Sequence, residues 1–338
     1  MNKNCREKII AFSDNNKIKF NSPYCEEHLF VVPPEELVSK FGKNNTIIVA
    51  SSAFDKIRSQ LISYGFDEGS IYLFNFAFMN LEYTDKEFVY DHMDDFERVY
   101  SRLADTKSKE IYKHILNYKI TKDEKYLISM QKYVDDEHYQ YFDNGLIEFR
   151  DDEVFLDIGA YTGDTYKVFS ELYSKYNKYI AFEADCRVYE VLKETVEKGK
   201  DNIILYNYAA WDKEDNLYFE ENPGSTRVGA ELTEIDNIVK GIRLDDLIDG
   251  EKVSFVKMDI EGAEYNALLG MEHLIKNNRP ILAICVYHLR DDYYKITDYI
   301  ETLVPGKYKY FFRQYRYTPT ETVCYAIPSN RTKAYSND

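Results

Sequence analysis

The chain has 338 residues, with 43 basic against 59 acidic side chains and a formal net charge of −16. This length is enough for two or three domains with a sizeable core. The acidic balance argues against a nucleic-acid or anionic-membrane partner, because both need a positive protein surface.

The sequence has no stretch that is long and apolar enough for a membrane span, and residues 1–19 lack the apolar core of a signal peptide. We therefore expect a protein of the cytoplasm. Five cysteines are scattered through the chain without metal-ligand spacing, which is typical of reduced structural thiols. They are Cys5, Cys25, Cys186, Cys285 and Cys324.

Alternating strand and helix patterns in residues 1–78 predict a small α/β unit with a parallel sheet. Strands are expected at 8–12, 46–50 and 71–74, and helices are expected to start at Pro33 and Phe54. The unit resembles the later part of a Rossmann-like domain that precedes several bacterial sugar-modifying enzymes, but it contains no glycine loop. We therefore expect it to serve packing, homo-oligomer formation or substrate shaping rather than dinucleotide binding.

Residues 79–150 change character and predict a helical connector or lid. Apolar residues recur at helical spacing among charged ones, beginning with Phe88, Met93 and Phe96. The periodicity breaks at 139–143, just before the next domain. Tyr141 and its aromatic neighbours either line the mouth of a ligand site or simply pack the domain junction.

From residue 151 to 330 the strand–helix alternation becomes regular, and 331–338 form a tail. The predicted parallel strands are 154–158, 179–183, 203–208, 254–259 and 281–286, and an antiparallel hairpin is predicted at 308–315 and 322–327. Helices are expected at 165–175, 187–198, 263–276 and 293–303. This α/β layout resembles the Rossmann-like sheet of class I methyltransferases.

In open α/β sheets, ligands bind beyond the carboxyl ends of the strands. The first of these strands ends in Asp157 and the glycine loop 159–163, and the second ends in Glu183, an acid placed to bind ribose hydroxyls. The third ends in a small, flat surface suited to adenine. The residues predicted to bind the cofactor are Asp157, Gly159, Ala160, Tyr161, Thr162, Gly163, Asp164, Thr165, Glu183, Ala184, Asp185, Ala209, Ala210, Trp211 and Asp259.

This set of residues fits S-adenosylmethionine better than NAD, because a phosphate-binding Gly-x-Gly-x-x-Gly loop is lacking. A nucleoside that carries an amino acid needs no such loop. The alternative is that Asp157 and Glu183 only cap helices or accept hydrogen bonds from backbone amides.

The fourth strand runs into Lys-Met-Asp-Ile-Glu-Gly-Ala-Glu at 257–264. Together with Asp-Ile-Gly-Ala-Tyr-Thr-Gly-Asp at 157–164, this stretch closely resembles the FkbM family of S-adenosylmethionine-dependent methyltransferases. Phe-Glu-Ala-Asp at 182–185, Leu-Asp-Asp-Leu at 244–247 and Tyr287-His288 also match, over residues 150–328 in all. Ala184 departs from the proline that is usual in the family, which affects turn rigidity more than chemistry.

The resemblance implies methyl transfer to a hydroxyl, often of a saccharide or another metabolite. Asp259 and His288 are the candidate catalytic residues, because a proton must leave the attacking hydroxyl and histidine titrates near neutral pH. A histidine that is only hydrogen-bonded at a strand end is the equal alternative for His288. A divalent metal held by Asp259 with neighbouring acids is compatible with the sequence but not required by it.

The acceptor is expected to be a small molecule or a saccharide. The insertion 222–229 is polar and turn-rich and is placed to touch cofactor or acceptor. The substrate candidates are Glu261, Ser225, Arg227, Arg290 and Tyr141. For each arginine, binding of an anionic substrate group competes with plain exposure to solvent. For Glu261 and Glu264 at a helix start, stabilisation of the helix dipole is the competing role, and for Glu264 it is favoured.

Two rival functions remain. An NAD-linked oxidoreductase would need the dinucleotide-binding loop that neither α/β region contains. A non-catalytic scaffold of a glycan-synthesis pathway would keep the cofactor fold without turnover. Cofactor binding without methyl transfer to any acceptor would favour the scaffold.

Overall fold

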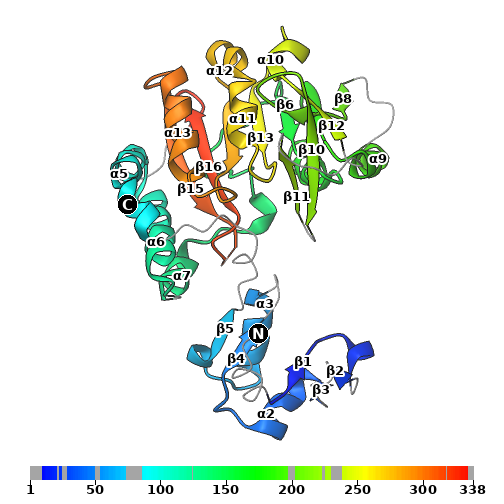
Figure 1. The fold of residues 1–338 in the computed structure, drawn as a ribbon, viewed down its shortest axis with the longest axis vertical. Helices are drawn as coiled ribbons and strands as arrows, with labels where there is room; N and C mark the ends of the chain where they lie inside the picture. Colours follow the sequence, from blue (N-terminus) through cyan, green and yellow to red (C-terminus); the bar gives the residue numbers. More distant parts are fainter. Residues whose placement is uncertain are drawn as a thin grey trace. The chain divides into compact units, whose positions relative to one another are not determined.

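A computed structural model gives the structure of the chain (Figure 1). It describes residues 10–20, 23–24, 29–49, 54–73, 86–123, 125–196, 202–222, 225–229, 238–316 and 318–333. The chain divides into an N-terminal unit, Met1–Met79, and a C-terminal unit, Asn80–Asp338. None of the helices in the described ranges is both long and apolar enough to cross a membrane.

The described residues of the N-terminal unit form two small sheets. In one, β3 pairs in parallel with β1 and antiparallel with β2; in the other, β4 and β5 are parallel. The strands are β1 (Phe12–Ser13), β2 (Pro23–Tyr24), β3 (Leu29–Val32), β4 (Ile47–Val49) and β5 (Ile71–Leu73). The helices are α2 (Leu37–Phe41) and α3 (Phe54–Ser63), with 3₁₀ turns at Lys17–Lys19, Pro34–Glu36 and Glu68–Ser70.

Several predictions for this unit are confirmed and others are wrong. A turn that begins at Pro34 leads into α2, and β4, α3 and β5 lie where they were expected. The sheet is not purely parallel, because β2 runs antiparallel to β3. Strand β2 was not predicted from the sequence. Strand β4 is buried on one face only, since Ile48 is 62% exposed while Val49 is 5% exposed. Most of the strand expected at 8–12 lies outside the described residues.

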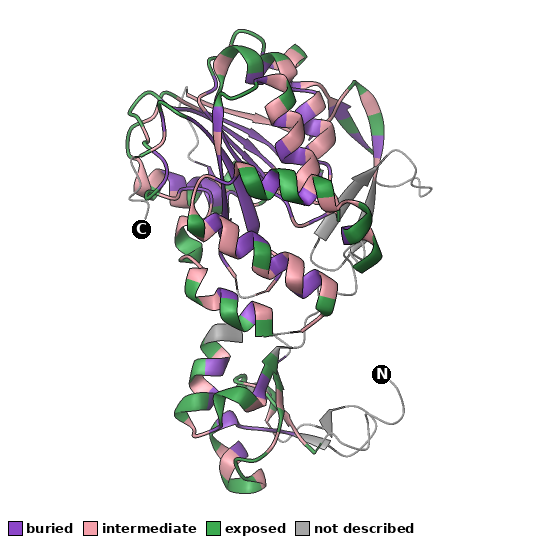
Figure 2. Cartoon of the chain, turned by 90° about the vertical axis from the view of Figure 1, so that its left-hand side faces the viewer, coloured by how far each residue is buried: buried purple, intermediate pink, exposed green. Residues whose placement is uncertain are grey.

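The C-terminal unit is built on a seven-stranded sheet in the order β15-β16-β14-β13-β6-β7-β8. Only β16 runs against the others, so the predicted parallel sheet with a closing antiparallel hairpin is confirmed. Strands β6, β13, β14 and β16 are buried along their whole length, which explains their continuous apolar sequences (Figure 2). The strands are β6 (Val154–Ile158), β7 (Lys178–Phe182), β8 (Ile203–Tyr206), β13 (Phe255–Met258), β14 (Ile281–Cys285), β15 (Tyr308–Gln314) and β16 (Thr322–Pro328).

Helices follow the parallel strands as expected for right-handed βα units. They are α8 (Asp164–Leu172), α9 (Cys186–Thr195), α10 (Leu244–Leu247), α11 (Glu264–Leu269), α12 (Glu272–Asn278) and α13 (Asp292–Leu303), of which the last three pack against one another beside the sheet (Figure 1). The single helix expected at 263–276 is in fact two, α11 and α12. The break lies at Gly270, where a Cβ would lie 1.9 Å from the carbonyl oxygen of Trp211.

A second sheet of four strands, in the order β11-β10-β12-β9, follows β8 in the chain. Its strands are β9 (Ala209–Ala210), β10 (Asp215–Asn222), β11 (Ser225–Gly229) and β12 (Ile238–Ile242). The interpretation of 222–229 as a turn-rich insertion is therefore wrong, because Asn222 and Ser225–Gly229 belong to an antiparallel pair of strands. Pro223 and Gly224 lie outside the described residues.

The predicted helical segment belongs to the same compact unit as the sheet. Its helices are α4 (Lys86–Asp91), α5 (Met93–Arg102), α6 (Thr106–Thr121) and α7 (Lys125–Met130), with 3₁₀ turns at Gln131–Tyr133 and Glu137–Tyr139. Helix α6 packs against the edge strand β15 and α5 packs against α13. A backbone hydrogen bond from Ala104 to Tyr310 also joins this segment to β15, so the helices cover the open edge of the sheet.

A buried ion pair fastens this helical layer to the sheet. The Arg313 side chain is 5% exposed, and its guanidinium lies 2.6 Å from Asp105 and 3.3 Å from Asp143. Asp105 is also the N-cap of α6 and accepts a hydrogen bond from the Ser108 amide. Burial alone would raise the pKa of Asp105, but the Arg313 guanidinium outweighs it and holds this pKa below its ordinary value.

We expect Asp105→Ala to lower the free energy of unfolding by about 3 kcal/mol, because the buried guanidinium loses a partner and α6 loses its cap. The contribution of Asp105 is complete above its unfolded pKa of about 3.9 and is lost as the pH falls through the lower folded value. Urea unfolding followed by the fluorescence of Trp211, the chain's single tryptophan, measures the change. Asp136→Ala is the control, because Asp136 is exposed and caps a 3₁₀ turn without contacting a buried arginine in the described structure. Equal losses in the two variants would contradict the assignment.

Candidate functional site

The carboxyl ends of β6 and β13 meet beneath the loop 159–163. Gly159 has φ +78°, and a Cβ on it would lie 2.0 Å from the carbonyl oxygen of Asp259. Only glycine fits such a close approach of two backbones. The loop that follows β6 is therefore pressed directly against the end of β13, which places the two predicted motifs side by side.

Beneath the loop, Asp157 is fully buried, and the hydroxyl of Tyr179 donates a hydrogen bond to it over 2.8 Å. Its other oxygen lies 3.2 Å from Nζ of Lys257, which also donates to the carbonyl oxygen of Gly159. Burial alone would lower the pKa of Lys257, but the carboxylates of Asp157 and Asp259 raise it above its ordinary value. The Asp157–Lys257 pair thus shapes the loop from below, and the predicted direct contact of Asp157 with a cofactor stays a prediction.

Glu183 holds the same loop from the side of β7. One carboxylate oxygen accepts a hydrogen bond from the Tyr161 amide at 2.8 Å, and the other accepts from the Asp185 amide at 2.9 Å. Burial raises the pKa of Glu183. The backbone-binding role considered as an alternative is therefore present. Each oxygen still has a second lone pair, so ribose hydroxyls could bind to the same carboxylate.

The rest of the loop leads into α8. Gly163, with φ +84°, is the N-cap, and Asp164 and Thr165 form the first turn of the helix. Ala160 is buried, whereas Tyr161 is 59% exposed and has φ +48°. Backbone N–H groups in the first turn of a helix have no acceptor within the helix, so this end of α8 suits an anionic group.

Other residues predicted to bind the cofactor have packing or capping roles. Asp185 caps α9 through the Arg187 amide and forms an ion pair with the Arg187 side chain. Ala209 is buried in the small core of the four-stranded sheet, and Ala184 and Trp211 pack against that core. Ala210 is buried as well. Contact of these residues with an adenine ring stays a prediction.

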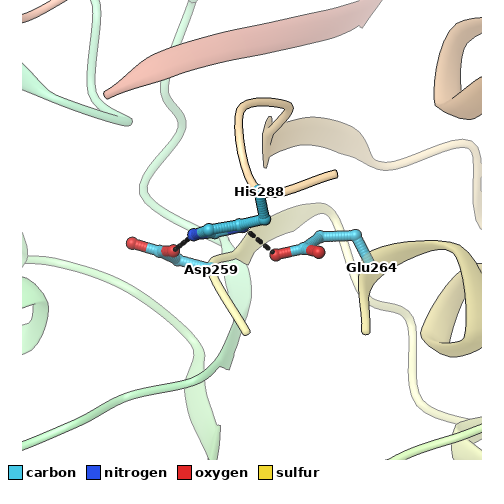
Figure 3. A group of neighbouring side chains, drawn as sticks. All are labelled: Asp259, Glu264 and His288. Atoms are coloured by element: carbon cyan, nitrogen blue, oxygen red, sulfur yellow. Dashed lines mark hydrogen bonds and ion pairs between the residues drawn. The ribbon is translucent and has the colours of Figure 1, made fainter. Parts of the chain in front are cut away.

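Asp259, Glu261, Glu264 and His288 form what we call the acid–histidine cluster, at the ends of β13 and β14. Figure 3 draws Asp259, Glu264 and His288. Nδ1 of His288 lies 2.9 Å from Oε1 of Glu264, while Nε2 lies 3.4 Å from Oδ1 of Asp259 and 3.5 Å from Oε2 of Glu261. Glu264 is fully buried, and its two oxygens accept hydrogen bonds from the amides of residues 260 and 262. It therefore holds the imidazole in place as well as lying at the start of α11.

The charges in this cluster differ from those expected from the sequence. Burial alone would lower the pKa of His288, but the carboxylates of Glu264, Asp259 and Glu261 raise it to about 10. Burial likewise opposes ionisation of Asp259, yet His288 and Lys257 hold its pKa below the ordinary value. Burial raises the pKa of Glu261 to about 7. His288 is therefore an imidazolium at neutral pH in this arrangement rather than a free base.

Two aromatic and two polar residues complete the surroundings, three of them from distant parts of the chain. The hydroxyl of Tyr141 donates to Oδ2 of Asp259 over 2.8 Å, so the segment 139–143 does reach the site. Gln140 donates to Glu321, which was not singled out from the sequence and whose φ is +64°. Tyr287 packs against His288, with ring centroids 4.2 Å apart. Nothing in the local sequence near Glu321 signals this position, because the contact depends on the folding of β16.

The remaining substrate candidates are not brought to the cluster by any described contact. Arg290 is exposed, and its guanidinium lies 4.4 Å above the ring of Phe88 in α4. Ser225 and Arg227 lie in β11, and the positions of their side chains lie outside the described set. Their contacts with a substrate stay predictions.

The residues of this site lie in a segment that matches a known protein family. Residues 157–317 match the model of the methyltransferase FkbM domain. This part of the chain is an FkbM methyltransferase domain. The match begins at Asp157 and includes the glycine loop, Glu183, Asp259 and His288, which are the residues gathered at the edge of the sheet. The prediction of a methyltransferase is therefore confirmed.

One solved structure with a TM-score above 0.5 supports the fold, and two others are similar at lower scores. The structure of the methyltransferase FkbM from Methylobacillus flagellatus is similar with a TM-score of 0.68 and 22% identity, over 94% of this chain and 83% of that one. Fibrillarin from Aeropyrum pernix, with natively bound S-adenosyl-L-methionine, gives 0.34 and 15%, over 56% of this chain and 73% of that one. A putative methyltransferase from Streptococcus mutans, in complex with SAH, gives 0.35 and 11%, over 54% and 90%. A search of curated proteins found no match.

Proposed function

We propose that this FkbM methyltransferase transfers a methyl group from S-adenosylmethionine to a hydroxyl of a saccharide or a saccharide-linked metabolite. The observation that carries the proposal is the acid–histidine cluster directly beside the glycine loop. Methylation of a hydroxyl needs the attacking oxygen aligned with the methyl group and a route for its proton. In this proposal the glycine loop holds the methyl donor and the cluster receives the proton, and both lie at one edge of the sheet.

The loop fits the cofactor in the chemistry of its groups. S-adenosylmethionine supplies an electrophilic methyl group on a sulfonium when it is bound. The free lone pairs of Glu183 suit its ribose hydroxyls, and the first turn of α8 suits its carboxylate. Gly159 leaves space that a Cβ would fill. Asp157 lies beneath the loop and forms an ion pair with Lys257, which donates a hydrogen bond to the carbonyl oxygen of Gly159.

The proton of the acceptor hydroxyl has a carboxylate within reach. His288 is already protonated at neutral pH and has no capacity for a further proton. The side chains of Asp259 and Glu261 are 25% and 36% exposed, whereas those of His288 and Glu264 are 3% and 0% exposed. The open side of the cluster is therefore formed by Asp259 and Glu261, where an acceptor can approach.

The charge of this open side affects which class of acceptor can bind. Asp259, Glu261 and Glu321 lie close enough to influence one another's pKa values. Such a concentration of carboxylates disfavours an anionic acceptor and favours a neutral polyhydroxyl compound. We therefore place a neutral saccharide ahead of a phosphorylated one. A cytoplasmic location and self-association through the N-terminal unit stay part of the proposal.

The test is transfer of an isotopically labelled methyl group to a panel of neutral and phosphorylated saccharides, with products located by mass spectrometry. We expect a methyl ether on a neutral sugar hydroxyl. Labelled products only at nitrogen or carbon acceptors would overturn O-methylation. Binding of S-adenosylmethionine without transfer to any of the acceptors would favour the scaffold function instead.

A further inference from the structure

We propose that Nε2 of His288 and the carboxylates of Asp259 and Glu261 bind a divalent cation. In the catalytic cycle this cation would orient and polarise the acceptor hydroxyl, a role that rests on the proposed O-methylation. The binding of the cation does not rest on it, and the two are tested separately.

The orientation of His288 is the first reason. Both oxygens of Glu264 are fixed by backbone amides, and one of them lies 2.9 Å from Nδ1. A carboxylate that accepts the N–H of one imidazole nitrogen fixes the tautomer and leaves the other nitrogen free to bind a metal. In His288 that other nitrogen is Nε2, which points toward Asp259 (Figure 3).

The surroundings of Nε2 are the second reason. His288 is only 3% exposed, and Nε2 is a buried atom without a hydrogen-bond partner among the residues that the structure describes. Asp259 and Glu261 face it at 3.4 and 3.5 Å, too far for good hydrogen bonds. Two ligand atoms that each lie about 2.1 Å from one ion are about 3.0 to 3.5 Å apart. The separations therefore suit ligands that share an ion.

Asp259, Glu264 and His288 also offer ligand atoms that all lie within 4.8 Å of one another. One ion cannot use all three, however, because Glu264 and Asp259 face opposite nitrogens of the same ring (Figure 3). Glu264 is therefore the residue that orients the histidine ligand, and the partly exposed Glu261 takes the third ligand position. Three protein ligands leave coordination positions for a hydroxyl or water.

The ligand chemistry narrows the class of ion. One imidazole and two carboxylates suit Mn²⁺, Fe²⁺ or Zn²⁺, whereas Mg²⁺ and Ca²⁺ prefer oxygen ligands alone. A metal ion binds the neutral form of the imidazole and takes the place of any proton at Nε2. The carboxylates around Nε2 would then surround the ion.

The experiment uses Mn²⁺ alone, titrated into the full chain without S-adenosylmethionine or acceptor, with free Mn²⁺ measured by electron paramagnetic resonance. We expect about one Mn²⁺ per chain. Glu261→Gln should weaken binding at least about tenfold, and Glu264→Gln should weaken it by about 10- to 100-fold through the orientation of His288. Glu261 is partly exposed, so its variant is expected to fold.

Glu321→Gln is the matched control, because it also removes a negative charge near Asp259 but not a proposed ligand. We expect it to weaken Mn²⁺ binding less than about threefold. Equal weakening in Glu261→Gln and Glu321→Gln would show diffuse attraction and overturn the site. Failure of the folded wild-type chain to bind millimolar Mn²⁺ would do the same.

The outcome is separable from that of the proposed function. Labelled methyl transfer to a sugar hydroxyl that persists after exhaustive chelation, in a chain that binds no Mn²⁺, would overturn the metal site and leave O-methylation intact. Stoichiometric Mn²⁺ binding that is sensitive to Glu261→Gln would support the site even if none of the saccharides is methylated.

Discussion

Asp259→Asn should slow methyl transfer about 1,000-fold while the fold is retained, because a positioned group that handles the proton contributes about 10²- to 10⁴-fold. Asparagine has the same shape and can still accept the hydrogen bond from Tyr141. It cannot carry the negative charge that faces Nε2 of His288 and the open side of the cluster. Initial rates with labelled S-adenosylmethionine at saturating acceptor measure the effect.

Tyr141→Phe is the matched control for Asp259→Asn. It removes the hydroxyl that donates to Oδ2 of Asp259 but leaves the carboxylate charge in place. We expect a loss of about tenfold, the size of one hydrogen bond to a charged group. An Asp259→Asn variant that binds S-adenosylmethionine normally and keeps more than a tenth of the wild-type rate would contradict the assigned role.

Gly159→Ala should destabilise the C-terminal unit by about 4 kcal/mol or more and abolish cofactor binding. The added Cβ would lie 2.0 Å from the carbonyl oxygen of Asp259 and 2.9 Å from a methyl group of Ile260. Relief requires β6 and β13 to separate at their carboxyl ends, in a core packed to crystal-like density. Urea unfolding followed by Trp211 fluorescence and calorimetric titration of S-adenosylmethionine measure the two effects.

Gly250→Ala separates the steric clash from the cost of the backbone conformation. Gly250 has φ +81°, close to the +78° of Gly159, but a Cβ there would meet no described atom within 4 Å. We expect it to cost about 1 kcal/mol, as a left-handed conformation does for an L-residue. If both variants lose the same stability, the close approach at Gly159 is not the reason for the glycine.

The places of many of the predicted cofactor residues in the fold could be predicted from the sequence. The strand at 154–158 is a continuous apolar run, and the glycines that follow it mark a turn that other residues cannot adopt. The same local logic located Glu183, Asp259 and His288 at strand ends. Parallel strands bring such ends to one edge of the sheet, so local signals were enough to predict where these residues gather.

Features that depend on contacts between distant residues could not be predicted. The need for glycine at 270, where the helix breaks, comes from the carbonyl oxygen of Trp211, which is remote in sequence. Strands β10 and β11 are largely polar, so the apolar alternation that signals strands is weak there. The protonation of His288 could not be predicted from the sequence either. It depends on three carboxylates that follow β13 and converge on the imidazole ring that follows β14.

The most direct test of the central claim is calorimetric titration of S-adenosylmethionine, S-adenosylhomocysteine and NAD into the wild type and Glu183→Ala. We predict micromolar binding of both sulfur compounds and none of NAD. Binding should weaken at least about tenfold in the variant, which loses the carboxylate that holds the Tyr161 amide and that we propose binds the ribose hydroxyls. Binding of NAD without binding of either S-adenosylmethionine or S-adenosylhomocysteine would contradict this account.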